Sequence, residues 1–81
     1  MFHFALPVWK DLVGKRRAAR LQAESPEIVS RLDRLQELRD VPIKRGTGRR
    51  YFLEWLQALE KSSYISHEEG ERYSKAAYPD E

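Results

Sequence analysis

The sequence has no cysteine, and this absence excludes several kinds of site at once. Disulfide staples, thiolate zinc centres and cysteine nucleophiles all need the thiol group. A chain without cysteine is compatible with a reducing compartment, and we expect a cytoplasmic protein. The only two histidines, His3 and His67, match no metal-binding spacing, so we predict neither a metal ion nor a cofactor.

The chain also lacks a long hydrophobic run. Its apolar opening, residues 1–9, has no basic leader, is interrupted by Pro7 and is followed directly by charged residues. This pattern is typical of neither a signal peptide nor a membrane span, and we predict no membrane partner. With 81 residues there is room for one small domain, whose ends at 1–6 and 79–81 we expect to fray. A deep catalytic cleft is not expected at this size, and no residue pattern points to an enzyme or to a small-molecule substrate.

Apolar residues recur at helical spacing along most of the chain. They predict a mainly α fold, a compact bundle of three longer helices and one short C-terminal helix. The expected helices cover, in chain order, residues 7–22, 26–39, about 49–62 and 67–77. Between the second and the third, residues 41–50 are expected to form a basic loop or a small hairpin.

Local start signals support two of these helices. Ser25 can accept a hydrogen bond from an early backbone amide, and Pro26 suits the first turn of the second helix. Ser66 and Glu69 have the spacing of a capping box at the start of the fourth helix. That helix is weakened by Gly70, which costs about 0.5 to 1 kcal/mol relative to alanine inside a helix.

Two helices carry apolar faces that need cover. In the second, leucine and isoleucine at intervals of four and three residues indicate a core stripe or, alternatively, a dimer seam. In the third, apolar side chains cover more than half of the circumference, which indicates a central helix or an exposed adhesive one. A second copy in a homodimer could cover this surplus, or Trp9 and the N-terminal Phe2 and Phe4 could fold back over it.

Positive charge is concentrated in one half of the sequence. Residues 1–50 hold twelve of the fifteen lysines and arginines against six acidic residues, a net charge of +6, whereas residues 51–81 have a net charge of −4. A polyanion is the natural partner of such a basic half, and nucleic acid is the most common polyanion. We therefore predict a nucleic-acid partner.

Two basic clusters are the candidate binding residues. The first lies in the Gly-containing run before the third helix, and it comprises Lys44, Arg45, Thr47, Arg49 and Arg50. Glycines that expose backbone amides, a hydroxyl and several cations before a helix start together favour phosphate binding; the alternative is a solvated basic turn. The second cluster is in the first expected helix, and it comprises Lys15, Arg16, Arg17 and Arg20. Cations in a last turn also suit the helix dipole, which is the alternative explanation there.

The segment 42–69 resembles the wing and the following helices of MerR-type and excisionase-type DNA-binding proteins. It has a proline, Pro42, a Gly-containing run ending in Arg49, Arg50 and Tyr51, and then an apolar helix. The resemblance implies that the two arginines meet backbone phosphates and that the tyrosine closes the wing. Upstream the chain differs from the family, because two long amphipathic helices are expected where the family has a short strand and a compact helix-turn-helix.

These observations predict a small non-enzymatic regulatory protein that binds nucleic acid, DNA in the first place, through a basic patch. The alternative is a protein-binding adaptor or inhibitor of the kind that phages and mobile elements encode, since aromatic residues are frequent interface anchors. Its candidate anchors are Trp9, Tyr51, Phe52, Trp55 and Tyr73. Nucleic-acid binding weakens steeply with salt, whereas binding through aromatic anchors changes little.

Overall fold

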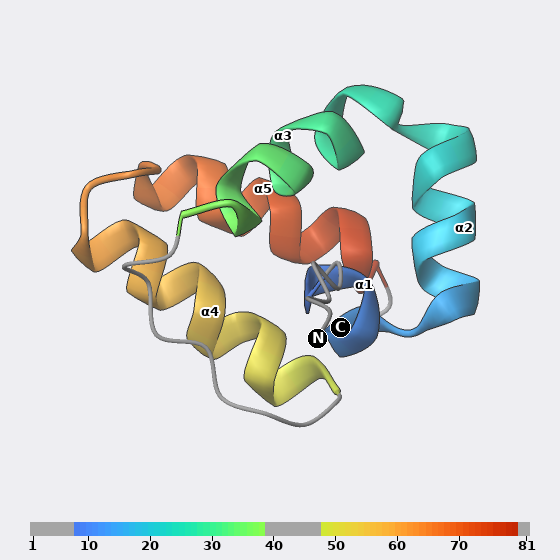
Figure 1. Cartoon of the computed structure of the whole chain (residues 1–81), viewed down its shortest axis with the longest axis horizontal. Helices are drawn as coiled ribbons and strands as arrows, with labels where there is room; N and C mark the ends of the chain where they lie inside the picture. Colours follow the sequence, from blue (N-terminus) through green and yellow to red (C-terminus); the bar gives the residue numbers. More distant parts are fainter. Residues whose placement is uncertain (1–7, 39–47, 80–81) are drawn as a thin grey trace, which may run out of the picture.

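The computed structural model describes residues 8–38 and 48–79, and within them the chain is helical with no strand. In this part of the chain, five helices pack into a globule with extents of 39 × 27 × 22 Å (Figure 1). They are α1 (Val8–Val13), α2 (Lys15–Glu24), α3 (Pro26–Gln36), α4 (Arg49–Lys61) and α5 (His67–Ala77). The predicted fold class, a small mainly α bundle, is confirmed. The expected loop or hairpin at 41–50 falls largely outside the described residues.

The prediction of one continuous helix over 7–22 is wrong, because the chain breaks at Gly14. This residue has φ 94° and ψ 152°, a backbone conformation that essentially only glycine adopts. The helix α1 therefore ends at Val13, and α2 begins immediately at Lys15. The break moves the first basic cluster from the last turn of a long helix to the beginning of a new one.

The start of α3 is confirmed, but one detail of it is wrong. Pro26 occupies the first turn as predicted, whereas the Ser25 side chain makes no capping hydrogen bond. Instead, the Ser25 carbonyl accepts from the amides of Ile28 and Val29 at 3.0 and 3.2 Å. The helix ends at Gln36 rather than near 39, since the next amides bond three residues back in a tightened final turn.

The apolar face of α4 belongs to the hydrophobic core, but the prediction that α4 is the central helix is wrong: α1 packs against α2, α3 and α4, whereas α4 packs mainly against α1 and α5. Leu32 of α3 and Phe52 and Leu59 of α4 are fully buried. Trp9 of α1 is also fully buried in this core; its indole N–H donates to Asp33 at 2.8 Å. Phe2 and Phe4 lie outside the described residues. Among the described residues, Tyr64 is the only large hydrophobic one that is exposed, while Tyr51 and Leu53 of α4 are partly buried. The homodimer stays a prediction.

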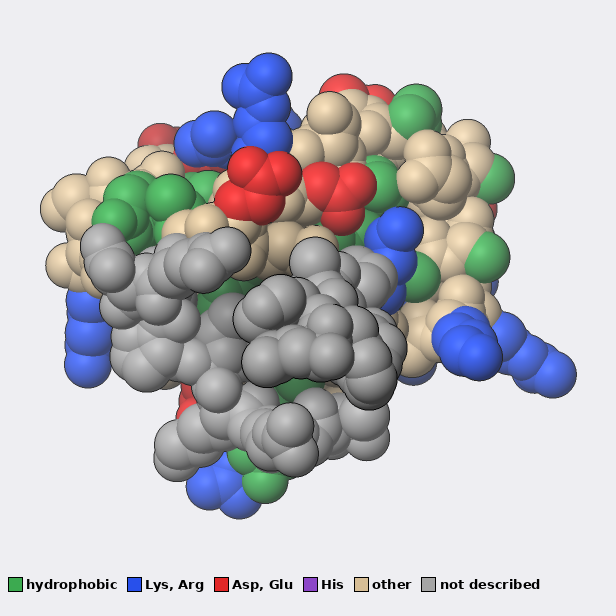
Figure 2. Space-filling model, viewed as in Figure 1, with side chains coloured by type: hydrophobic (Ala, Val, Ile, Leu, Met, Phe, Trp, Pro, Cys, Tyr) green, Lys and Arg blue, Asp and Glu red, His purple; other side chains and the backbone are tan. Residues whose placement is uncertain are grey.

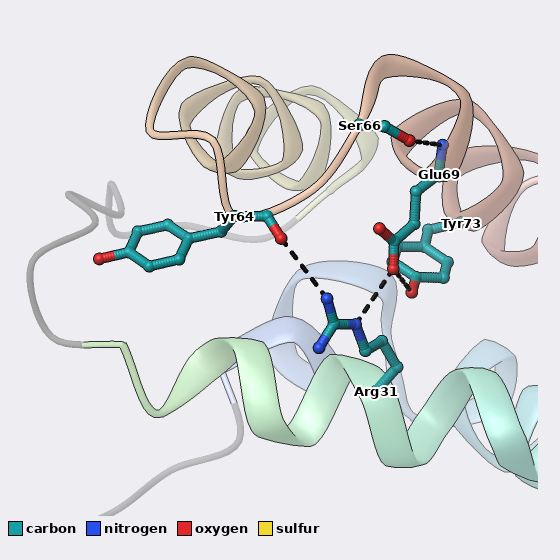
Figure 3. Close-up of polar contacts among 5 residues, drawn as sticks. All are labelled: Arg31, Tyr64, Ser66, Glu69 and Tyr73. Carbon is teal, nitrogen blue, oxygen red and sulfur yellow. Dashed lines mark hydrogen bonds and ion pairs between the residues drawn. The ribbon is translucent and has the colours of Figure 1, made fainter.

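A polar network joins α3 to α5 (Figure 3). Arg31 of α3 donates to the Glu69 carboxylate at 3.0 Å and to the Tyr64 carbonyl at 3.4 Å. Tyr73, one turn further along α5, donates its hydroxyl to the same carboxylate oxygen. The Ser66 hydroxyl accepts from the Glu69 amide at 3.1 Å, which confirms the predicted cap. The network fixes the start of α5 against α3.

Burial would raise the pKa of the Glu69 carboxyl, but the hydrogen bonds from Tyr73 and Arg31 outweigh it and lower the pKa. The same contacts raise the pKa of Arg31, chiefly through its hydrogen bond to Glu69. Burial, followed by the hydrogen bond to Glu69, raises the pKa of the Tyr73 hydroxyl. The network is therefore held in the form with ionised Glu69, protonated Arg31 and neutral Tyr73.

Gly70 of α5 leaves room for a side chain of α4. It is buried, and a Cβ atom added there would overlap with the carboxylate of Glu60 on α4. The residue that weakens α5 as an isolated helix therefore leaves the space that Glu60 occupies. In Figure 1, α4 and α5 lie side by side and are joined by the short turn at 62–66.

Candidate nucleic-acid interface

The structure describes six of the nine predicted nucleic-acid-binding residues. Lys15, Arg16, Arg17 and Arg20 lie on α2, and Arg49 and Arg50 form the first turn of α4. The other three, Lys44, Arg45 and Thr47, lie outside the described residues. Tyr51, which the wing resemblance places at the end of the wing, is the third residue of α4 and is half-buried.

The basic start of α4 is attached to the end of α1, just before the basic start of α2. The Gly48 amide, just before α4, donates to the Leu12 carbonyl near the end of α1 at 2.8 Å. Because α2 begins three residues after Leu12, this bond brings the basic start of α4 close to the basic start of α2. Figure 1 shows the beginning of α4 beside α1, whose end leads into the lower end of α2. Both basic helix starts are thus attached to the end of α1, although they are more than thirty residues apart in the sequence.

Both helix starts have an unusual charge. The dipole of a helix makes its N-terminus partly positive, so acidic residues are favoured there and cations are not. The helices α3 and α5 follow this preference, with Glu27 in one first turn and Glu68 and Glu69 in the other. In contrast, α2 and α4 have no acidic residue in their first turns. Lysine and arginine stand at both starts instead.

Neither basic start is capped by a side chain. The N-cap residues are Gly14 and Gly48, whose positive φ angles are 94° and 121°, and neither has a side chain that could accept from the first amides. The early N–H groups and the cations around them therefore all favour a negatively charged partner. The alternative explanation of the α2 cluster, cations in a last turn, is excluded because Gly14 places Lys15, Arg16 and Arg17 in the first turn.

On α2 the cations are accessible. Lys15, Arg16 and Arg20 are exposed, and an open hollow of about 340 Å³ is lined by Arg16, Arg17 and Arg20. Figure 2 shows lysine and arginine side chains projecting at the lower right, where α2 begins in Figure 1. A hollow lined by guanidinium groups suits phosphate oxygens, because each guanidinium presents several donors in one plane.

Arg17 differs from its neighbours, because its guanidinium is also a structural contact. It donates to the Ala77 carbonyl at 3.2 Å and lies over the Tyr78 ring, 4.6 Å from the ring centre. Tyr78 is buried, contacts Phe52 and donates its hydroxyl to the Leu12 carbonyl at 3.2 Å. Sequence reasoning missed this role, since nothing in the local pattern links a basic residue of α2 to a tyrosine beyond α5.

Arg50 is placed differently from Arg17. Its side chain is 84% exposed and lies 3.5 Å from the Glu54 carboxylate one turn along α4. An exposed pair of this kind contributes little to stability, at most about 0.5 kcal/mol, so a phosphate can replace the carboxylate at low cost. Arg49 is exposed beside it.

The predicted aromatic anchors of a protein partner do not form an exposed face. Trp9, Phe52, Trp55 and Tyr73 are each at most 1% exposed, and they belong to the hydrophobic core. The apolar periodicity that Phe52 and Trp55 share along α4 therefore reflects packing inside the domain. Of the five candidates only Tyr51 remains half-buried, and one partly covered tyrosine is no aromatic patch.

A second polar cluster lies at the opposite end of α4. His67 Nδ1 is 3.0 Å from a Glu60 carboxylate oxygen, and His67 Nε2 is 3.7 Å from Glu71. The hydrogen bond to Glu60, with the negative charges of Glu60 and Glu71, raises the pKa of the His67 imidazole. Within residues 8–38 and 48–79, however, no group of histidine and acidic side chains is arranged to hold a metal ion.

No helix in the described part of the chain is both long enough and apolar enough to cross a membrane. The basic surface is the candidate functional site because of the cations and uncapped helix starts described above. Comparison with known proteins gives no further assignment: no protein-family model matches the chain, and neither a curated protein nor a solved structure shows significant similarity to it.

Proposed function

We propose that this chain is a small, non-enzymatic regulatory protein that binds nucleic acid, with DNA as the favoured ligand. The binding surface comprises the exposed cations of α2 and the first turn of α4. The observation that carries the proposal is the presence of cations at two uncapped helix starts, both of which are attached to the end of α1: α2 follows it directly, and the Gly48–Leu12 hydrogen bond holds α4 to it. Within the fold these cations lie at the positive ends of the helix dipoles, which is unfavourable. A bound polyanion compensates for the cations and for the dipole ends together.

Phosphate contacts explain how such a surface binds. Lys15, Arg16 and Arg20 reach the phosphates on one side, while Arg49 and Arg50 reach them on the other. Each contact releases condensed counterions from the nucleic acid, so affinity falls steeply as the salt concentration rises. These contacts fix the position and orientation of the protein, whereas a sequence preference requires contacts to the bases.

One group of acidic residues lies on a different part of the molecule. Glu68 and Glu71 are exposed in the first turns of α5, which begins at the far end of α4 from the basic surface. A polyanion is repelled there and attracted at the start of α2, so this charge distribution orients the protein as it approaches.

The proposal is tested by removing the two α4 cations together. For the variant Arg49→Ala with Arg50→Ala, we expect weaker binding to a DNA duplex at low salt. The slope of log affinity against log salt should fall in magnitude by about 1.8, which corresponds to two lost phosphate contacts. Fluorescence anisotropy at several salt concentrations measures both quantities.

A matched control removes two cations elsewhere. Arg34 on α3 and Lys61 at the end of α4 are exposed and lie outside the proposed surface. The variant Arg34→Ala with Lys61→Ala has the same net charge as the test variant, and we expect its salt slope to match that of the unchanged protein. Equal slopes for both variants and the unchanged protein would exclude α4 from the interface.

A further inference from the structure

The helix α2 covers little of the core. Of its ten residues only Ala18 and Leu21 are buried. In Figure 1 it stands at the edge of the molecule, and one exposed side of it follows the helical spacing i, i+3, i+4 and i+7. We call these four residues, Arg16, Ala19, Arg20 and Ala23, the α2 ridge, and all four are exposed.

The composition of the α2 ridge suits close approach to a duplex. Two arginines supply donors, and the two alanines that alternate with them leave the helix backbone nearly uncovered. An α-helix has a diameter of roughly 10 to 12 Å, and ten residues are about 15 Å long. The major groove of B-form DNA is about 12 Å wide, which admits one such helix. Arginine donates to guanine there, and the methyl group of alanine contacts that of thymine.

Two other nucleic-acid forms fit the surface less well. Single strands are typically bound by stacking their bases on exposed aromatic side chains. Tyr64 is the only exposed aromatic side chain among the described residues, and it lies at the turn between α4 and α5, away from α2. An RNA duplex has a deep and narrow major groove that a helix cannot enter.

We propose that α2 enters the major groove of B-form duplex DNA with its ridge towards the base edges, while the start of α4 holds the adjacent phosphates. This inference rests on the proposed function and specifies its ligand. The hydrogen bond between Gly48 and Leu12 sets the position of Arg49 and Arg50 relative to α2, and hence which phosphates they reach.

The ligand form is tested with three probes of equal length and matching sequence: a DNA duplex, an RNA duplex and a single DNA strand. We expect the DNA duplex to bind about tenfold or more tightly than either alternative at the same salt concentration, since only it offers the groove contacts. Equal affinity for the DNA and RNA duplexes would overturn the groove inference but leave the proposed phosphate binding intact. No binding to any probe would overturn the proposed function itself.

The position of α2 is tested by adding bulk to the ridge. The variant Ala19→Leu with Ala23→Leu keeps the charge and good helix propensity, and both positions are exposed, so we expect it to fold. We expect its affinity for the DNA duplex to fall about tenfold, because the helix can no longer approach the base edges. Its affinity for the single strand should stay unchanged.

The control variant places two leucines on exposed positions of other helices, Ser30→Leu on α3 with Gln57→Leu on α4. We expect it to bind all three probes like the unchanged protein. If the ridge variant also binds the DNA duplex with full affinity, α2 does not enter the groove.

Discussion

Gly14 sets the geometry on which the basic surface depends, and replacing it by alanine tests that role. Its φ of 94° and ψ of 152° lie in a region that an L-residue occupies only with strain. Such strain costs on the order of 1 to 3 kcal/mol per residue. None of the described atoms lies within 4 Å of a Cβ added at Gly14, so the cost comes from the backbone alone and not from a clash.

We therefore expect Gly14→Ala to destabilise the domain by about 1 to 3 kcal/mol. For a domain of this size each kcal/mol lowers the melting temperature by about 4 to 8 °C, so the expected decrease is roughly 4 to 24 °C. Thermal unfolding followed by circular dichroism measures it. If α1 and α2 relax into one continuous helix, the first cations of α2 also leave the surface, and affinity for a DNA duplex falls with stability.

The sharpest control is the mirror-image residue. Chemical synthesis can place D-alanine at position 14, which adds the same methyl group but favours positive φ. We expect the D-alanine protein to lose less stability than the Gly14→Ala protein, because D-alanine favours the positive φ that this position requires. If the Gly14→Ala protein has the same melting temperature as the unchanged protein, position 14 does not need a positive φ, and the break between α1 and α2 is refuted.

Three further predictions concern the core and the two polar clusters. Leu35 is only 3% exposed, so Leu35→Ala should cost about 2 to 5 kcal/mol in urea unfolding, and a midpoint that barely moves would place the α3 stripe outside the core. Because folding lowers the pKa of Glu69, ionised Glu69 stabilises the fold above pH 4.5, and this stabilisation is lost as the pH falls through the folded-state pKa. Glu69→Gln should therefore destabilise by about 1 to 2 kcal/mol near neutral pH and less in acid, whereas a pH-independent loss would contradict the ion pair with the half-exposed Arg31. For His67 the pH dependence is reversed, because folding raises its pKa. Protonated His67 stabilises the fold fully below pH 6.5, and this stabilisation disappears as the pH rises through the folded-state pKa. NMR titration should find this pKa above 6.5, and Glu60→Gln should lower it, whereas an unchanged value would separate the two side chains.

The sequence was sufficient to predict a helix where local signals and tertiary packing agree. The apolar pattern of α4 and the Ser66 cap of α5 predicted both helices within about one residue. The break at Gly14 was missed because a glycine inside a helical pattern costs only about 1 kcal/mol and is often tolerated there. Its positive φ is not determined by the residues on either side.

The candidate site was predictable only in part. Composition identified the basic residues, but the position of the α4 start relative to α1 and α2 depends on the Gly48–Leu12 hydrogen bond, which joins segments distant in the sequence. The structural role of Arg17 depends on Tyr78 in the same way. Conversely, the aromatic residues that resembled interface anchors are those that a small domain needs for its core.

The most direct test of the account is to map the bound surface by NMR. The backbone amide signals of the isotope-labelled protein are followed while a short DNA duplex is added. The account predicts the largest chemical-shift changes at the start of α2, residues 14–20, and at the start of α4, residues 48–51, with the first turn of α5 nearly unaffected. Changes concentrated at the start of α5, or no change at a duplex excess in low salt, would contradict the proposal that the two basic helix starts bind nucleic acid.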